Sequence, residues 1–275
     1  MTNSELPPPA IRSAAARFLT DDAVWSAFEG GRTNTGWRGR DGHRDLVFKL
    51  YRVDRSNPVF PNDPHAEWRV LSALKGTNLA PQPVELLEVE GQSCLVYDYV
   101  SGETFETATP EMARALGTLH AMPPSGLSGS RADTGGLIGA GCALFDDDPA
   151  PIRVDYGERR VFLHGDPTPA NALKTADGVR FLDWQCPTHG DPVDDLAVLV
   201  SPAMHVVYGA RVLTSFERRM VLEAYPDKAT VARYQLLAPD LSRAIANYCR
   251  WKVACGEEDY APALDAEMAY LAALT

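Results

Sequence analysis

The most informative part of this chain is Val161-Phe162-Leu163-His164-Gly165-Asp166-Pro167-Thr168-Pro169-Ala170-Asn171, followed by Phe181-Leu182-Asp183-Trp184 and then by Gly190-Asp191-Pro192. A short apolar run leads a His and an Asp into a proline-rich loop. Asn171 stands five residues after Asp166, and a second apolar run leads to Asp183, twelve residues after Asn171. The spacing of these polar residues is more informative than any one of them.

The polar residues of this stretch are those that a phosphoryl-transfer site requires. Asp166 can align a hydroxyl group and accept its proton. Asn171 and Asp183 offer an amide oxygen and a carboxylate, which are ligands that Mg²⁺ accepts. We expect His164 to support the loop by hydrogen bonding rather than to act as a base. Asp and Asn are also common caps and turn residues, but the whole set at this spacing favours the catalytic interpretation.

Composition limits the classes of protein that the chain can belong to. With 275 residues, 45% of them hydrophobic, the chain can bury a core in one large domain or two modest lobes. The net charge of -11 disfavours nucleic acid and anionic membranes as partners and weakly suits a cationic substrate. The five scattered cysteines, without a C-x-x-C pair, suit a reducing compartment, and no run approaches the roughly 20 apolar residues of a membrane span. We therefore expect a cytoplasmic protein, and its oligomeric state stays open.

The first hundred residues predict a sheet of strands with one inserted helix. Turn signals at Gly30-Gly31 and Asp41-Gly42 suit hairpins, and Asp63-Pro64 suits the start of a helix that Gly76 ends. The expected elements are a helix over 10–19, strands over 23–28, 33–38 and 45–51, a helix over 63–75, and strands over 84–89 and 94–99.

The pattern becomes mostly helical after residue 100. Residues 123–150 are rich in Gly, Pro, Ser and Asp and predict a loop with one short helix. Further helices are expected over 110–121, 194–201, 212–224, 229–254 and 261–273. The sequence thus predicts an α+β, two-lobed protein. A small, mainly antiparallel β lobe with one helix covers residues 1–100, and a larger, mainly helical lobe covers residues 101–275.

One superfamily has the same arrangement of motifs. The chain resembles the aminoglycoside phosphotransferases and choline kinases in His164-Gly165-Asp166, Asn171, Asp183-Trp184 and Gly190-Asp191-Pro192-x-x-Asp195-Leu196-Ala197. The resemblance is dense over residues 161–200 and looser over 25–100. It implies a protein-kinase-like fold, Asp166 as the catalytic base, Asn171 and Asp183 as magnesium ligands, and ATP with Mg²⁺ as cofactors. Asp191 and Asp195 are expected to support the loop structurally.

The N-terminal half offers candidates for binding the nucleotide. Lys49 lies among apolar neighbours in a predicted strand, and the resemblance implies that it contacts the α- and β-phosphates. Its expected partner is Glu67, because Val70, Leu71 and Leu74 follow at i+3, i+4 and i+7 and place Glu67 on the inward face of the helix. An exposed lysine and a solvated glutamate are the alternative.

Two further segments are candidates for nucleotide contact because of their place in the chain relative to the family that it resembles. The segment 28–35 resembles the hairpin that covers the nucleotide, and Gly30 and Gly31 there permit close approach of the backbone to phosphate. It lacks G-x-G-x-x-G, so a plain hairpin turn is equally compatible. Tyr97 and Tyr99 lie in the segment that corresponds to the adenine-binding hinge. Whether ATP or GTP is the preferred donor stays open.

The resemblance implies that the C-terminal helices line the pocket for the phosphate acceptor. Tyr248, Trp251 and Tyr260 with the acids of 257–259 could hold a cationic amine, although core packing beside a solvated acidic run is the alternative. We expect transfer of the γ-phosphoryl group of ATP to a hydroxyl of a small molecule, an amino alcohol or an aminoglycoside-like cationic acceptor. A sugar or thiamine kinase, or a nucleotide-binding pseudokinase, are the alternatives. The short interval after Trp184 argues against a protein kinase.

Overall fold

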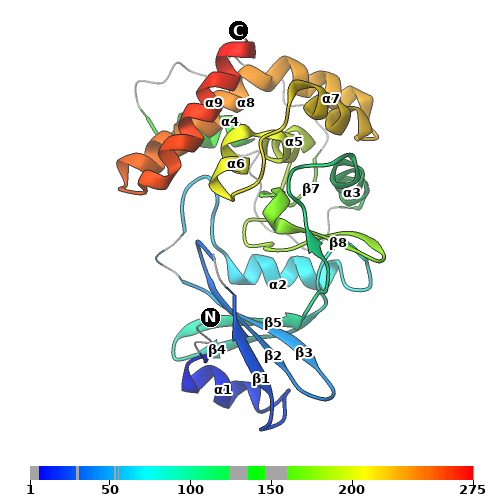
Figure 1. The fold of residues 1–275 in the computed structure, drawn as a ribbon, viewed down its shortest axis with the longest axis vertical. Helices are drawn as coiled ribbons and strands as arrows, with labels where there is room; N and C mark the ends of the chain where they lie inside the picture. The colour runs from blue at the N-terminus through cyan, green and yellow to red at the C-terminus, as the bar shows by residue number, and fades with distance from the viewer. Residues whose placement is uncertain are drawn as a thin grey trace.

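A five-stranded antiparallel sheet forms the N-terminal lobe, and helices form most of the C-terminal lobe (Figure 1). The computed structural model describes residues 6–28, 31–52, 54, 56–123, 136–145 and 160–274. The α+β, protein-kinase-like class that the sequence predicts is confirmed. The division into two domains at residue 100 stays a prediction.

The sheet of the N-terminal lobe is built from hairpins. Its order is β1-β2-β3-β5-β4, with β1 Val24–Ala27, β2 Thr35–Arg40, β3 Asp45–Leu50, β4 Pro83–Val89 and β5 Gln92–Asp98. The Asp41 side chain accepts hydrogen bonds from the His43 and Arg44 N–H groups at 2.7 Å each and closes the β2–β3 turn. Arg40 pairs with Asp45 across this turn, so β2 runs two residues further than the sequence predicts.

Helices cover the two faces of the sheet. α1 (Pro9–Ala15) packs Ile11 and Ala15 against the face that carries Trp37 and Phe48. α1 is shorter than predicted, because the backbone turns at Ala15 and brings Leu19 back onto the sheet. α2 (Pro64–Ala73) lies on the other side, between the sheet and the C-terminal lobe (Figure 1).

Capping fixes the start of α2. The Asp63 side chain accepts from the His65 and Ala66 N–H groups at 2.9 and 3.0 Å, and Pro64 occupies the first turn, as predicted. Glu67, Val70 and Leu71 are buried on one face of the helix. This face is the one that the spacing of the sequence predicts to point inward.

Helices and short strands of the C-terminal lobe surround the loop that contains Asp166 and Asn171. β7 pairs with β10, and β6, β8 and β9 form a second small sheet. Its elements are β6 Glu103–Thr104, α3 Pro110–His120, α4 Gly136–Cys142, β7 Val161–Leu163, β8 Ala172–Thr175, β9 Gly178–Phe181, β10 Thr188–Gly190, α5 Pro192–Val200, α6 Pro202–Val207, α7 Ser215–Ala224, α8 Lys228–Ala254 and α9 Ala261–Leu274. α4 is the short helix expected within 123–150; the rest of that segment, apart from residues 123 and 143–145, lies outside the described residues.

Two helices differ from the sequence prediction for local reasons. α6 was not expected; Ser201 caps it by accepting from the Met204 N–H, and Pro202 starts it directly after α5. α7 starts at Ser215 rather than near 212, because Thr214 and Glu217 form a capping box. Both corrections lie at helix starts, where side-chain hydrogen bonds decide the boundary.

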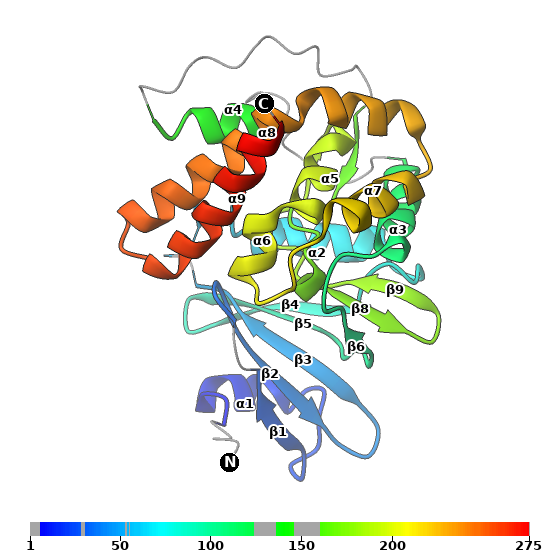
Figure 2. The same ribbon diagram turned by 45° about the horizontal axis from the view of Figure 1, so that its top comes forward.

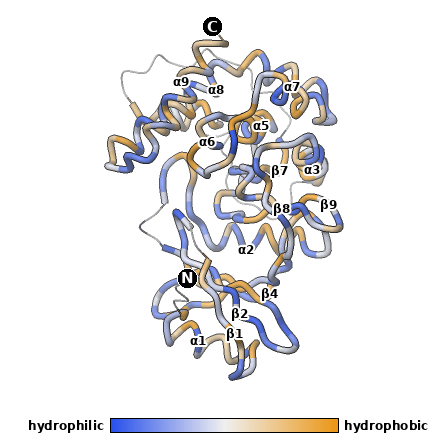
Figure 3. The backbone as a smooth tube through the Cα atoms, viewed as in Figure 1, coloured by the Kyte–Doolittle hydropathy of each residue, from blue (hydrophilic) through white to orange (hydrophobic). Residues whose placement is uncertain are grey.

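The core of the C-terminal lobe lies around α5. Every residue of α5 is buried, and Figure 3 shows its apolar stretch inside the lobe. α8 and α9 pack against each other on one side of it (Figure 2). Among the described helices, none combines the length and the apolar character that a bilayer crossing requires.

Glu267 of α9 anchors the start of α6. Its buried carboxylate accepts from Ser201 Oγ at 2.6 Å, from the Ala203 N–H at 3.0 Å and from Ser242 Oγ at 2.8 Å. Burial raises the pKa of Glu267, and these donors oppose that shift. One side chain thereby ties α9 to α8 and to the first turn of α6.

We expect Glu267→Ala to lower the free energy of unfolding by about 3 kcal/mol, because three buried donors lose their acceptor. Urea denaturation of both proteins measures the change. Glu223→Ala, at an exposed position of α7, is the control and should cost less than about 0.5 kcal/mol. Equal effects of the two substitutions would contradict the anchoring role.

Candidate functional site

The loop between β7 and β8 is held in place by Asp195 of α5. This fully buried carboxylate accepts from the His164 N–H at 2.8 Å and the Gly165 N–H at 2.9 Å. His120 Nε2 lies 3.1 Å from it. Burial opposes the charge of Asp195, but its hydrogen bonds with His120 and the loop lower its pKa, so that it stays ionised.

His164 acts within this loop as a neutral hydrogen-bonding group. Burial lowers the pKa of its imidazole. Its Nε2 lies 2.9 Å from the Leu182 carbonyl oxygen, which can only accept, and its Nδ1 receives the Asp166 N–H at 3.2 Å. His164 is therefore the Nε2–H tautomer, with both nitrogens engaged in supporting the loop.

Asp166 and Asn171 face each other across the loop. Asn171 Nδ2 donates to the Asp166 carbonyl at 2.9 Å and to Asp166 Oδ2 at 3.0 Å. Because the amide nitrogen faces Asp166, the amide oxygen is turned away from it. That oxygen is the atom of Asn171 that can serve as a metal ligand.

Asp183 has an unusual backbone conformation. Its φ of 57° lies in the left-handed region, and Glu90 in the β4–β5 turn is the other non-glycine residue with positive φ in the described part of the chain. Such a conformation costs on the order of 1–3 kcal/mol and concentrates at functional sites. It directs the carboxylate to Lys49 Nζ, with which it forms an ion pair between the two lobes.

Lys49 forms the other side of this ion pair. Its Nζ also donates to Glu67 Oε2 at 2.6 Å, and the Tyr51 hydroxyl donates to the same oxygen. Burial opposes the charge of Lys49, but the carboxylates of Asp183 and Glu67 outweigh burial and raise its pKa. Lys49, Glu67 and Asp183 therefore come together as the sequence interpretation requires, and Tyr51 joins them as a partner that it missed.

The donor set suits Mg²⁺. Asn171 supplies one amide oxygen and Asp183 one carboxylate, and this cation usually takes one or two carboxylates and completes its shell with phosphate and water. Within the described residues, no three His, Cys, Asp or Glu side chains gather as a metal-binding group. The residues present fit a metal ion whose remaining ligands are phosphate oxygens and water.

The remaining nucleotide candidates have different outcomes. Gly30 lies outside the described residues. Gly31 lies in a tight turn, where a Cβ atom would come within 2.6 Å of the Asn34 carbonyl oxygen. Tyr97 is paired within the sheet with Val47. The Tyr99 N–H donates to the Asp45 carbonyl at 2.9 Å, so this hinge donor is engaged within the protein.

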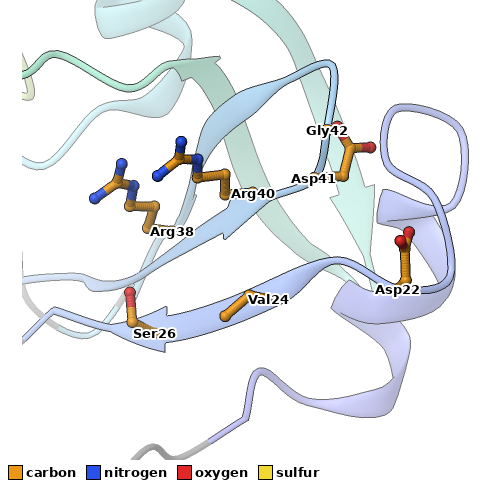
Figure 4. A pocket seen from close by; sticks show the side chains of 7 residues that line it. All are labelled: Asp22, Val24, Ser26, Arg38, Arg40, Asp41 and Gly42. Atoms are coloured by element: carbon orange, nitrogen blue, oxygen red, sulfur yellow. The ribbon is translucent and has the colours of Figure 1, made fainter.

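A polar hollow lies on the sheet face that carries Lys49 (Figure 4). Its walls are formed by Asp22, Val24, Ser26, Arg38, Arg40, Asp41 and Gly42. Arg38 is opposite Val47 in the register, two residues from Lys49, so both side chains are on the face away from α1. The Arg38 guanidinium stacks on the Tyr99 ring at 3.6 Å and pairs with Asp45.

A second cavity contains Asp166. It lies between the hairpin of the N-terminal lobe and the C-terminal helices, and its walls include Arg32, Phe60, Tyr208, Tyr248, Lys252 and Tyr260. The sequence interpretation missed Arg32 and Tyr208. Arg32 directly follows the Gly30-Gly31 pair in the sequence, which is a usable signal. Tyr208 follows the unexpected helix α6 and has no such signal.

The cavity already contains two cations of the protein itself. Arg32 forms an ion pair with Asp259 and lies 5.0 Å from the Tyr260 ring centre. Lys252 Nζ lies 2.7 Å from Glu257 and 5.3 Å from the same ring. Two of the acids and all three of the aromatic rings that the sequence assigns to an acceptor cation therefore lie against internal cations.

Asp191 and Asp195 have the structural roles that the sequence predicts. Asp191 is the N-cap of α5, where its side chain accepts from the Val193 N–H at 3.0 Å, and it pairs with Arg233. Asp195 binds the loop one turn further along the same helix. The start of α5 thus fixes the segment that contains Asp166.

We expect Gly165→Ala to lower the free energy of unfolding by at least about 3 kcal/mol. The φ of Gly165 is +89°, and a Cβ atom would collide with the Cys186 carbonyl oxygen. Chemical denaturation measures the loss. Gly178→Ala is the matched control, because Gly178 also has positive φ but has open space around it, so it should cost about 1 kcal/mol. Similar losses at both positions would contradict the proposed collision.

Solved structures share this fold at low sequence identity. A choline/ethanolamine kinase family protein from Mesorhizobium loti has a TM-score of 0.64 at 18% identity, over 96% of this chain and 94% of the other. A choline kinase from Cryptosporidium parvum Iowa II has a TM-score of 0.64 at 13% identity, over 94% and 90%. A spectinomycin phosphotransferase, solved with ADP and spectinomycin, has a TM-score of 0.56 at 13% identity, over 89% of each chain.

The resemblance that the sequence motifs indicate is confirmed by these comparisons. No curated protein matches the chain. Residues 24–137 and 142–227 match the Phosphotransferase enzyme family, and the match includes Lys49, Asp166 and Asp183. The chain belongs to the Phosphotransferase enzyme family.

Proposed function

We propose that this protein is an ATP- and Mg²⁺-dependent kinase that phosphorylates a hydroxyl group of a small molecule. One observation carries the proposal: the ion pair of Lys49 with Asp183 joins the lobes next to the loop that holds Asp166 against Asn171. Phosphoryl transfer requires positioning and charge neutralisation more than covalent chemistry, and this arrangement offers both.

Each residue then has a distinct role. Lys49 binds the α- and β-phosphates, and Glu67 with Tyr51 holds its side chain in place. Asp166 aligns the acceptor hydroxyl and receives its proton. Asn171 and Asp183 would hold Mg²⁺, which supplies positive charge next to the phosphates. His164 keeps the loop in shape through the Leu182 carbonyl.

We place the nucleotide on the sheet face that carries Lys49. The polar hollow on this face supports that placement, and the spectinomycin phosphotransferase of similar fold was solved with ADP. The base would then lie towards Tyr97 and Tyr99, where Arg38 already covers the Tyr99 ring. ATP is the proposed donor, and GTP is the comparison that a donor assay should include.

We propose an amino alcohol or an aminoglycoside-like molecule as the first class of acceptor to test. The net charge of -11 supports a cationic acceptor. The similarity in fold to a choline/ethanolamine kinase family protein and to a spectinomycin phosphotransferase supports the same class. The internal pairs of Arg32 with Asp259 and of Lys252 with Glu257 must open before those acids can bind such a molecule. A sugar or thiamine acceptor is the alternative and does not require this exchange of cations.

The test is ATP consumption with a panel of amino alcohols, aminoglycosides, sugars and thiamine, repeated with Asp166→Asn. We expect one acceptor to stimulate ATP consumption. Asp166→Asn should reduce kcat by about 10²–10⁴-fold, because the proton acceptor is lost, while nucleotide binding is retained. Turnover within threefold of the wild type at saturating substrates would contradict the assignment of Asp166.

We expect Asp183→Ala to abolish the effect of Mg²⁺ on nucleotide affinity, because the variant lacks the carboxylate proposed to hold the ion. Titration of a fluorescent ATP analogue at increasing Mg²⁺ concentration measures the effect without turnover. Asp177→Ala, an exposed acid in the β8–β9 turn, is the control with the same change of charge. An unchanged magnesium dependence in Asp183→Ala would show that another residue holds the ion.

A further inference from the structure

The hydroxyl group of Tyr208 lies against the carboxylate of Asp166. Tyr208 Oη donates to Asp166 Oδ2 at 2.9 Å, and Asn171 Nδ2 donates to the same oxygen at 3.0 Å. Two donors from different directions on one oxygen fix the plane of the carboxylate. The orientation of the second oxygen, Oδ1, is then fixed as well.

The protonation state of Tyr208 makes it a donor in this contact. Burial raises the pKa of its phenol well above the ordinary value, and the charge of Asp166 adds to the shift. The hydroxyl therefore stays protonated. A protonated phenol beside a carboxylate donates a charge-assisted hydrogen bond, which is stronger than one between neutral groups.

The backbone of Tyr208 is fixed by the end of α6. Tyr208 is the C-cap residue, and Gly209 follows with φ of +71°. The Gly209 N–H donates to the Val206 carbonyl at 3.1 Å and the Ala210 N–H to the His205 carbonyl at 2.8 Å. This is the Schellman arrangement, which gives the residue at the end of the helix a defined conformation.

The other end of α6 is fixed as well. Ser201 caps the helix, and the buried Glu267 of α9 accepts from both the Ser201 hydroxyl and the Ala203 N–H. α6 is thus anchored at its first turn by a buried carboxylate and at its last by a glycine turn. A short helix with both ends anchored can hold a side chain at a fixed distance from a loop that Asp195 fixes independently.

We propose that Tyr208 is a positioning residue for phosphoryl transfer: its hydroxyl holds Asp166 in the orientation in which the carboxylate aligns the acceptor hydroxyl. This role rests on the proposed function. Tyr208 acts through Asp166 and not on the nucleotide. Because the Tyr208 hydroxyl already donates to Asp166, its removal affects the rate of transfer rather than the affinity for either substrate.

The first experiment is Tyr208→Phe, which removes one oxygen atom and keeps the ring in the cavity wall. We expect kcat to fall roughly tenfold to hundredfold, the effect of losing one hydrogen bond to a charged group, with both KM values within twofold of the wild type. Tyr234→Phe is the matched control. It removes a buried phenol oxygen that lies 3.4 Å from Tyr270 Oη, and it should keep wild-type kinetics.

The second experiment places Tyr208→Phe in the Asp166→Asn background, under single-turnover conditions that keep low rates measurable. Because Tyr208 acts through the carboxylate, we expect less than a twofold further loss there. Wild-type kcat in Tyr208→Phe, or the same fall in both backgrounds, would overturn the proposal. Wild-type turnover in Asp166→Asn alone would instead refute the proposed base, and the proposal for Tyr208 would fall with it.

Discussion

The rest of the site depends on the hydrogen bonds that the Asp195 carboxylate accepts. It is fully buried in the first turn of α5 and accepts hydrogen bonds from the N–H groups of His164 and Gly165, which directly precede Asp166 in the chain. A buried charge is tolerated only when hydrogen bonds satisfy it, and here His120 and the loop that contains Asp166 supply those bonds. A residue of the helical core therefore holds this loop in place.

Asp183 and Lys49 extend this order to the other lobe. The segment that follows β9 and leads to Asp183 is tied to the loop by the hydrogen bond of the Leu182 N–H to the Asn171 carbonyl, at 2.8 Å. Asp183 then forms an ion pair with Lys49, and Lys49 forms a second ion pair with Glu67 of α2. A chain of hydrogen bonds and ion pairs thus runs from the helical core to the sheet. The strained backbone of Asp183 is the part of this chain that local structure alone does not stabilise.

The sequence could predict those parts of the site whose partners are close in the chain or follow a helical or strand period. The loop with Asp166 and Asn171, the strand lysine Lys49 and the inward face of Glu67 belong to this group. Tyr208 lies 42 residues from Asp166, and Arg32 lies 227 residues from Asp259. Contacts of that kind depend on how helices and hairpins are packed, and no local pattern contains them. Helix starts were also misplaced where a cap such as Thr214 decided the boundary.

The contacts of Arg32 with the C-terminal lobe have a thermodynamic consequence for the two proposed substrates. Arg32 stands in the hairpin proposed to cover the nucleotide, yet its guanidinium contacts Asp259, the Tyr260 ring and the Val207 carbonyl of the C-terminal lobe. A change in the hairpin on binding of the proposed nucleotide would alter the walls of the cavity proposed for the acceptor. By linkage, the same coupling free energy would act in both directions, so that each ligand would change the affinity of the protein for the other by an equal factor.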